Sequence, residues 1–160
     1  MSSQIGYVIV LTTESKKNSE SVTITGNILH WSSTKCKRIT RSVLASELYA
    51  IVAGFDNGSA IHSTINSVLS SQVPLVICTD LYLLYDYITK LNTTAEKRLI
   101  IDIIGLRKSY ERREIDKIRW IDGNCNPADA MTKEKPGQAL KQLIETNTLD
   151  LVTKGWVDRA

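Results

Sequence analysis

The apolar residues at the start of this chain follow the pattern of β-strands. Residues 4 to 11 form an apolar, β-branched run that predicts a buried strand, and the polar residues 12 to 21 predict a loop. Residues 22 to 32 predict a second strand, broken at Gly26-Asn27, a dipeptide that tolerates the backbone angles of a turn. An antiparallel hairpin is therefore predicted for this part of the chain.

The pattern then changes to helical spacing. Apolar residues from 44 to 55 recur at positions that fall within an arc of about 100° on a helical wheel. Glu47 lies at the border of this arc, where a carboxylate can be held rigidly and still reach water. Gly54 and Gly58 weaken the pattern, so we expect a second helical stretch between them and Pro74.

A short apolar run interrupts the helical spacing. Residues 75 to 79 predict a central parallel strand, and Asp80 lies between this strand and the next helical stripe. Thr93 and Glu96 have the spacing of a capping box, which predicts a helix from about 95 to 112. The chain therefore passes from strand to helix twice in this region.

The last part of the chain repeats this alternation. Residues 115 to 121 alternate as in a strand, Asn126 suits a helix N-cap, and Pro127 suits the first helical position. The last helix is expected to resume through Leu143, and the tail from 147 has no clear period. Strands that alternate with helices after a hairpin predict an α/β fold with a mixed sheet.

Length and composition fit one globular domain. The chain has 160 residues, of which 42% are hydrophobic and 23% charged, so we expect a single domain over 1–160. The apolar run 5–11 is far shorter than the roughly 18 residues that span a bilayer, and no secretory signal is visible. An intracellular protein is expected. The three cysteines form no zinc or disulfide pattern, and the net charge of +3 is mild.

Three acidic residues occupy settings in which a metal-dependent nuclease places its carboxylates. Glu47 lies on a predicted helix, Asp80 at the end of a predicted strand, and Asp129 in the first turn of a predicted helix. Each also has a structural interpretation. Asp80 could cap the following helix, and Asp129 could interact with a helix dipole, an effect of about 0.3 to 1 kcal/mol.

Five short segments, taken in order, match one known pattern. They are 30–35 (His-Trp-Ser-Ser-Thr-Lys), 41–49 (Arg-Ser-Val-Leu-Ala-Ser-Glu-Leu-Tyr), 78–80 (Cys-Thr-Asp), 97–102 (Lys-Arg, then Asp) and 126–133 (Asn-Pro-Ala-Asp-Ala-Met-Thr-Lys). Together they resemble the ribonuclease H domain at the C-terminal end of copia-type long-terminal-repeat retrotransposon polyproteins, especially fungal ones. The resemblance covers residues 3 to 133 and leaves 134 to 160 as a C-terminal helix and tail.

The resemblance implies a ribonuclease H-like α/β fold, a mixed sheet with helices on both faces. It implies two-metal hydrolysis of the RNA strand of an RNA/DNA hybrid, with Glu47, Asp80 and Asp129 as catalytic residues and Mg²⁺ ligands. The implied partners are the hybrid and an upstream reverse transcriptase domain of the same polyprotein, without a membrane or a small-molecule cofactor. The implied location is the cytoplasm, in a virus-like particle, or the nucleus.

The N-terminus departs from the family pattern. In the family, a first strand that carries an Asp precedes a Ser-x-x-Gly-Tyr segment, and residues 2 to 7 resemble that later segment. We therefore expect the chain to start after the first catalytic Asp and to lack the central strand, which leaves two unpaired strand edges. Hydrolysis is expected to be impaired, with one Mg²⁺ ion or weak binding. The alternatives are a catalytically silent nucleic-acid-binding or scaffold remnant of the fold, and an unrelated α/β protein.

Basic residues cluster just before the helix that carries Glu47. Those predicted to contact the phosphates of the hybrid are Lys35, Lys37, Arg38 and Arg41. The basic groups after residue 97 could line the same phosphate track, although a solvated helix face is the favoured interpretation for them. Trp31 and Trp120 are predicted to be core residues, and His62 to be structural or exposed.

Overall fold

Five strands and four α-helices form the part of the chain that a computed structural model describes, residues 3–38, 40, 42–90 and 92–157. The strands are β1 (Gln4–Lys16), β2 (Ser21–Lys35), β3 (Val76–Thr79), β4 (Lys117–Ile121) and β5 (Thr148–Val157). The α-helices are α1 (Val43–Leu69), α2 (Tyr82–Thr89), α3 (Ile100–Glu111) and α4 (Ala139–Thr146). The 3₁₀ helices are η1 (Lys97–Leu99), η2 (Gly123–Cys125) and η3 (Pro127–Met131).

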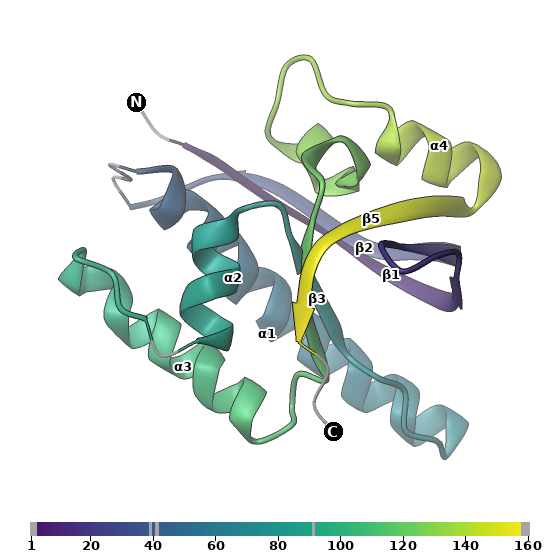
Figure 1. The fold of residues 1–160 in the computed structure, drawn as a ribbon, viewed down its shortest axis with the longest axis horizontal. Coiled ribbons are helices and arrows are strands. Elements are labelled where there is room, and N and C mark those ends of the chain that lie inside the picture. The colour runs from purple at the N-terminus through teal and green to yellow at the C-terminus, as the bar shows by residue number, and fades with distance from the viewer. Residues whose placement is uncertain (1–2, 39, 41, 91, 158–160) are drawn as a thin grey trace.

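The strands form one curled sheet in the order β1-β2-β5-β4-β3 (Figure 1). Neighbouring strands are antiparallel except for β3 and β4, which are parallel. β5 joins the two halves of the sheet, because residues 148–152 pair with β2 and residues 153–157 pair with β4. The predicted α/β class with a mixed sheet is confirmed. β3 is parallel as predicted, but it is an edge strand instead of a central one.

Two buried clusters lie on opposite faces of the sheet. The larger one includes Leu48, Leu84 and Ile118 and is covered by α1, α2 and α3. The smaller one includes Ile121 and Leu143 and is covered by α4. Ile118 and Ile121 belong to different clusters because successive side chains of a strand point to opposite faces. Helices therefore pack on both faces of the sheet (Figure 1).

The opening hairpin is longer than predicted. β1 continues to Lys16 through the expected loop, and the chain turns between Lys16 and Ser21. Gly26-Asn27 lies inside β2, so the turn predicted there is wrong. Gly26 serves close packing, because an added Cβ would lie 2.0 Å from the Leu11 carbonyl oxygen of the neighbouring strand.

Two predicted helix boundaries are wrong. α1 runs without a break through Gly54 and Gly58, so the two expected helical stretches are one helix. The helix predicted from about 95 begins at Ile100, after the short η1. The Thr93 capping box is not formed, because the Glu96 side chain instead accepts a hydrogen bond from Ser42 (2.6 Å). Tertiary contacts have replaced a local cap.

The tail that has no clear helical or strand period forms β5, which lies inside the sheet between β2 and β4. Leu149 and Leu151 alternate with Asp150 and are buried in the smaller cluster. This alternation was the available sequence signal, although it covers only three residues. Within the described ranges, no helix combines the length and apolar character needed to cross a membrane.

Trp31 is not a core residue, since 63% of its surface is exposed. Leu29 has no partner in the β1–β2 register and forms a bulge, which reverses the alternation of the residues that follow. Trp31 therefore lies on the face of the sheet away from α1. Trp120 packs on the larger cluster as predicted, and His62 is structural, with its Nε2 2.5 Å from the Val73 carbonyl oxygen.

Candidate metal centre

Glu47 is positioned by the first turns of α1. The helix is capped by Ser42, whose hydroxyl accepts a hydrogen bond from the Ala45 amide (3.2 Å) and donates one to Glu96 (2.6 Å). Leu48, the next residue after Glu47, is completely buried, whereas Glu47 is partly buried. The predicted border position of Glu47 is confirmed, and the neighbouring core contacts restrict its movement.

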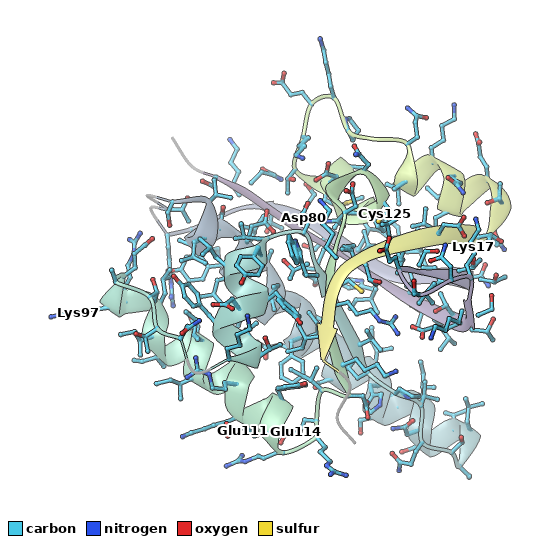
Figure 2. The ribbon with its side chains drawn as sticks, viewed as in Figure 1. Lys17, Asp80, Lys97, Glu111, Glu114 and Cys125 are labelled. Atoms are coloured by element: carbon cyan, nitrogen blue, oxygen red, sulfur yellow. The ribbon has the colours of Figure 1, made fainter. Side chains whose placement is uncertain are left out.

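Asp80 lies between the end of β3 and the start of α2, as predicted. No side chain caps α2, and the Leu81 amide donates instead to the Thr79 hydroxyl (3.1 Å), so the capping interpretation of Asp80 is wrong. A Cβ added to Gly123 would lie 3.4 Å from Oδ2 of Asp80. The carboxylate therefore faces the η2 segment, which also carries Cys125 (Figure 2).

Asp129 lies in the first turn of η3, which is a 3₁₀ helix. Asn126 caps this helix as predicted, because its Oδ1 accepts a hydrogen bond from the Ala128 amide (3.0 Å). Oδ2 of Asp129 accepts a hydrogen bond from the Lys133 ammonium group (2.8 Å), and the two side chains form an ion pair. Asp129 is therefore already paired with a cation of the protein.

Contacts with the first two strands hold η3 in place. The Ser33 hydroxyl of β2 donates a hydrogen bond to the Met131 carbonyl oxygen (2.5 Å). A Cβ added to Gly6 of β1 would lie 2.3 Å from Cβ of Met131, so only glycine allows this close approach. These contacts fix Asp129 relative to the hairpin.

The three carboxylates converge on one region although they come from distant parts of the chain. The pKa of Glu47 is raised to about 7, first by burial of the carboxyl group and then by the negative charges of Asp80 and Asp129. Lys133 acts in the opposite direction. The pKa of Lys133 is raised, first by its hydrogen bond to Asp129, with smaller contributions from the charges of Asp80 and Glu47.

The chemistry of this group of side chains suits a hard cation. Mg²⁺ prefers carboxylate oxygens, and a cation between these carboxylates would relieve the repulsion that adds to burial in raising the pKa of Glu47. In their present positions, however, no three His, Cys, Asp or Glu side chains of the described residues are gathered closely enough to hold an ion. A cation bound at Asp129 would compete with its hydrogen bond to Lys133.

Lys133 belongs to the site, although the sequence did not single it out as a site residue. Its spacing of four residues from Asp129 was the available signal, because residues with this spacing can pair along a helix. Replacing Lys133 with methionine removes a positive charge close to Glu47. The pKa of Glu47 is then expected to rise above about 7, because Lys133 is the group that lowers it. Carboxyl NMR titration without metal measures this change, with Lys141→Met as the control, and an unchanged or lower pKa would contradict the arrangement.

The predicted phosphate-binding residues are largely on the surface. Lys35, Lys37 and Arg38 are exposed, and the Arg38 guanidinium lies 5.2 Å from the centroid of the Tyr49 ring. Arg41 lies outside the described residues. Among the later basic residues, Arg107 donates hydrogen bonds to the Tyr87 and Asn92 carbonyl oxygens, so it joins α2 to α3 instead of lying on a solvated face.

Comparisons with known proteins found no match to a family model, a curated protein or a solved structure. The function therefore has to be inferred from the site itself. Its distinctive property is the convergence of Glu47, Asp80 and Asp129 beside one lysine.

Proposed function

We propose that this chain is a ribonuclease H-like domain that binds Mg²⁺ through Glu47, Asp80 and Asp129 and acts on the RNA strand of an RNA/DNA hybrid. The observation that carries the proposal is the convergence of these carboxylates from α1, the end of β3 and η3. When bound, paired Mg²⁺ ions would activate a water molecule and stabilise the leaving oxygen of the phosphodiester.

The chain's own groups set the conditions for binding the cation. The Glu47 carboxyl group keeps its proton up to about pH 7 without metal, so binding of Mg²⁺ there releases a proton. A bound cation would compete with Lys133 for Asp129, and the Lys133 ammonium group would then be available to pair with a substrate phosphate. Affinity for Mg²⁺ therefore rises with pH in the range around 7.

In finer detail, the proposed fold is a ribonuclease H-like sheet without its first strand. β1 and β3, the two edges of the sheet, are the strands between which a central strand would pair. The described residues bring together three carboxylates where the resemblance implies four, so we propose slow hydrolysis by this chain alone. β5 lies outside the motif-bearing residues 3–133, and the resemblance does not account for it.

The proposed path for the hybrid runs along the end of β2. Lys35 and Lys37 are exposed there, and Ser33 joins the same strand to η3, which carries Asp129. The exposed indole of Trp31 offers a surface on which a base or sugar can stack. Charge and stacking are thus available next to the candidate metal centre.

Replacing both Lys35 and Lys37 with alanine is expected to weaken binding of an RNA/DNA hybrid and to reduce its salt dependence. Each phosphate contact contributes a slope of about −0.9 for a duplex, so the slope of log affinity against log salt should become less steep by about 2. Fluorescence anisotropy over a range of salt concentrations measures the slope. Lys141→Ala, at an exposed position on α4, is the control. An unchanged slope would remove these lysines from the path.

The second candidate function is a catalytically silent nucleic-acid-binding domain of the same fold. One observation favours it: Asp129 forms an ion pair with Lys133, which neutralises its charge. In this case the basic end of β2 would still bind the hybrid, while the acidic residues would have no catalytic consequence.

Cleavage of a labelled RNA/DNA hybrid in Mg²⁺ distinguishes the two functions. The chain is compared with a form that is extended upstream by a strand that carries Asp. Both forms are tested without substitution, with Glu47→Gln, and with Glu145→Gln as the control. We expect slow cleavage by the chain, faster cleavage by the extended form, and a loss of at least about 100-fold with Glu47→Gln, equivalent to about 2.7 kcal/mol of transition-state stabilisation. Rapid cleavage by the short chain would contradict the expected impairment. An extended form that binds but does not cleave would favour the silent domain.

A further inference from the structure

A residue from a distant part of the chain holds the first turn of α1. The Ser42 hydroxyl donates a hydrogen bond to Oε1 of Glu96 (2.6 Å) and accepts one from the Ala45 amide (3.2 Å). Ser42 and Glu96 are 54 positions apart in the sequence, and Glu96 lies directly before η1. One hydroxyl group therefore joins the start of the helix that carries Glu47 to the segment that leads into α3.

The bond to Glu96 determines how Ser42 caps the helix. A serine hydroxyl has one proton and two lone pairs. Because the Glu96 carboxylate takes the proton, the oxygen presents a lone pair to the Ala45 amide, which is the role that a cap requires. α1 has no acidic residue in its own first turn. Glu96 therefore also supplies, from another element, the negative charge that a helix N-terminus favours.

Glu96 is itself held in place by the segment around it. Its amide donates a hydrogen bond to the Thr94 hydroxyl (3.1 Å), and its carbonyl oxygen accepts one from the Leu99 amide (2.9 Å). Thr94 is buried, and Leu99 is completely buried in the larger cluster. The Glu96 side chain is only 32% exposed, and a nitrogen of Arg98 lies 3.4 Å from its Oε2. Glu96 thus transmits the position of a segment anchored in the core to Ser42.

Glu47 depends on this first turn because it lies in the turn that follows. At about 1.5 Å per residue, Glu47 is about 7.5 Å along the helix from Ser42. The terminal turn of a helix frays when its amide groups have no partner. If the first turn opens, Glu47 lies at the end of the shortened helix, and its carboxylate loses its fixed position beside Asp80 and Asp129.

We propose that Glu96 is a positioning residue of the candidate metal centre, which acts through Ser42 to fix the first turn of α1 and thereby the place of Glu47. The effect on metal binding and hydrolysis rests on the proposed function. The effect on the first turn of α1 does not depend on any metal.

The test compares variants of the full chain that keep or remove the bond. Glu96→Ala removes the acceptor, whereas Glu96→Gln keeps an acceptor oxygen without the charge. Ser42→Ala removes the hydroxyl, and its combination with Glu96→Ala gives a double-mutant cycle, which measures how far the two residues act through each other. Glu145→Ala, at an exposed glutamate on α4, is the control. Circular dichroism checks that each variant is folded.

Hydrogen exchange of the Ala45 amide, measured by NMR in EDTA, reports on the first turn without metal. Glu96→Ala is expected to speed this exchange by about tenfold, an amount typical of a lost cap. Glu96→Gln is expected to speed it by less than about threefold, because only the charge at the helix end is lost. In the Ser42→Ala background, Glu96→Ala should add less than about threefold, since the hydrogen bond that it breaks is already absent.

Two further measurements connect the first turn to the metal centre. Isothermal titration calorimetry should show that Mg²⁺ binds about tenfold more weakly to Glu96→Ala, and within about threefold of the unsubstituted affinity to Glu96→Gln and Glu145→Ala. Cleavage of the labelled hybrid at a subsaturating Mg²⁺ concentration should lose kcat in Glu96→Ala. The KM for the hybrid should change by less than about twofold, because Lys35 and Lys37 lie outside the first turn of α1.

Three results would overturn the proposal. They are an Ala45 exchange rate that Glu96→Ala leaves unchanged, losses with Glu96→Gln as large as those with Glu96→Ala, and additive effects of the Ser42 and Glu96 substitutions. Faster exchange with unchanged Mg²⁺ affinity would also overturn it, because Glu47 would then be held independently of the first turn. If the unsubstituted chain binds no Mg²⁺, the proposed function fails, and the exchange rates alone decide whether Glu96 positions the start of α1.

Discussion

Replacing Glu47 with glutamine is expected to stabilise the metal-free protein by about 2 kcal/mol at pH 8 and to have little effect at pH 5. The pKa of Glu47 rises from 4.5 to about 7 on folding, so the folded state binds more protons than the unfolded state between these values. Stability is therefore lost as the pH rises through this range. The full shift corresponds to about 3 kcal/mol, and partial exposure of the carboxyl group reduces the effect to about 2 kcal/mol.

Urea unfolding in EDTA at several pH values between about 5 and 8 measures this difference, with Glu145→Gln as the control for an exposed glutamate. Mg²⁺ should reduce the difference at pH 8, because a cation beside the ionised carboxylate removes the repulsion in the unsubstituted protein. If both variants follow the pH dependence of the unsubstituted protein, neither burial nor the charges of Asp80 and Asp129 raise the pKa of Glu47, and the candidate metal centre loses its main support.

The parts of the fold that the sequence predicts are those with local partners. The helical spacing around Glu47, the alternation of β4 and the Asn126 cap all depend on residues within a few positions of each other. The position of Asp80 follows in the same way, since a buried strand ends where its apolar run ends. These local signals place the three carboxylates on their elements.

The parts that the sequence does not predict depend on distant partners. β5 is stabilised by pairing with β2 and β4, and its own apolar pattern is too short to indicate this. The exposure of Trp31 depends on one bulged residue, Leu29, which reverses the faces of the strand. Gly26 makes a close contact with β1, whereas the Gly26-Asn27 dipeptide indicated a turn at this position. Each error comes from a tertiary contact that overrides a local preference.

The convergence of the carboxylates was predicted neither by local sequence patterns nor by any single distant contact. Periodicity placed Glu47, Asp80 and Asp129 on separate elements but gave no reason for them to meet, and only the resemblance implied a shared site. Burial is the main cause of the raised pKa of Glu47, and the charges of Asp80 and Asp129 add to it, which they can do only from nearby, so this smaller contribution supplies a physical reason to group the three residues. The role of the group in catalysis stays a prediction.

Replacing Leu48 with alanine is expected to lower the free energy of unfolding by about 2 to 5 kcal/mol. Leu48 is fully buried in the larger cluster, where it is the residue of α1 that follows Glu47. Its removal deletes the contacts of a large apolar side chain and leaves a cavity between α1 and the helices beside it. Val68→Ala is the matched control on the same helix, because the Val68 side chain is 77% exposed and should change stability by less than about 0.5 kcal/mol.

Urea unfolding at pH 7 measures both variants, and NMR titration of Glu47 in the Leu48→Ala protein adds a second readout. If Leu48 anchors the helix that positions Glu47, loosening that anchor lets water reach the carboxyl group and lets it move away from Asp80 and Asp129. The pKa of Glu47 should then fall from about 7 toward its ordinary value. A loss of stability below about 1 kcal/mol would contradict the burial of Leu48. A large loss with an unchanged pKa would show that the carboxylates are held together independently of the core beneath them.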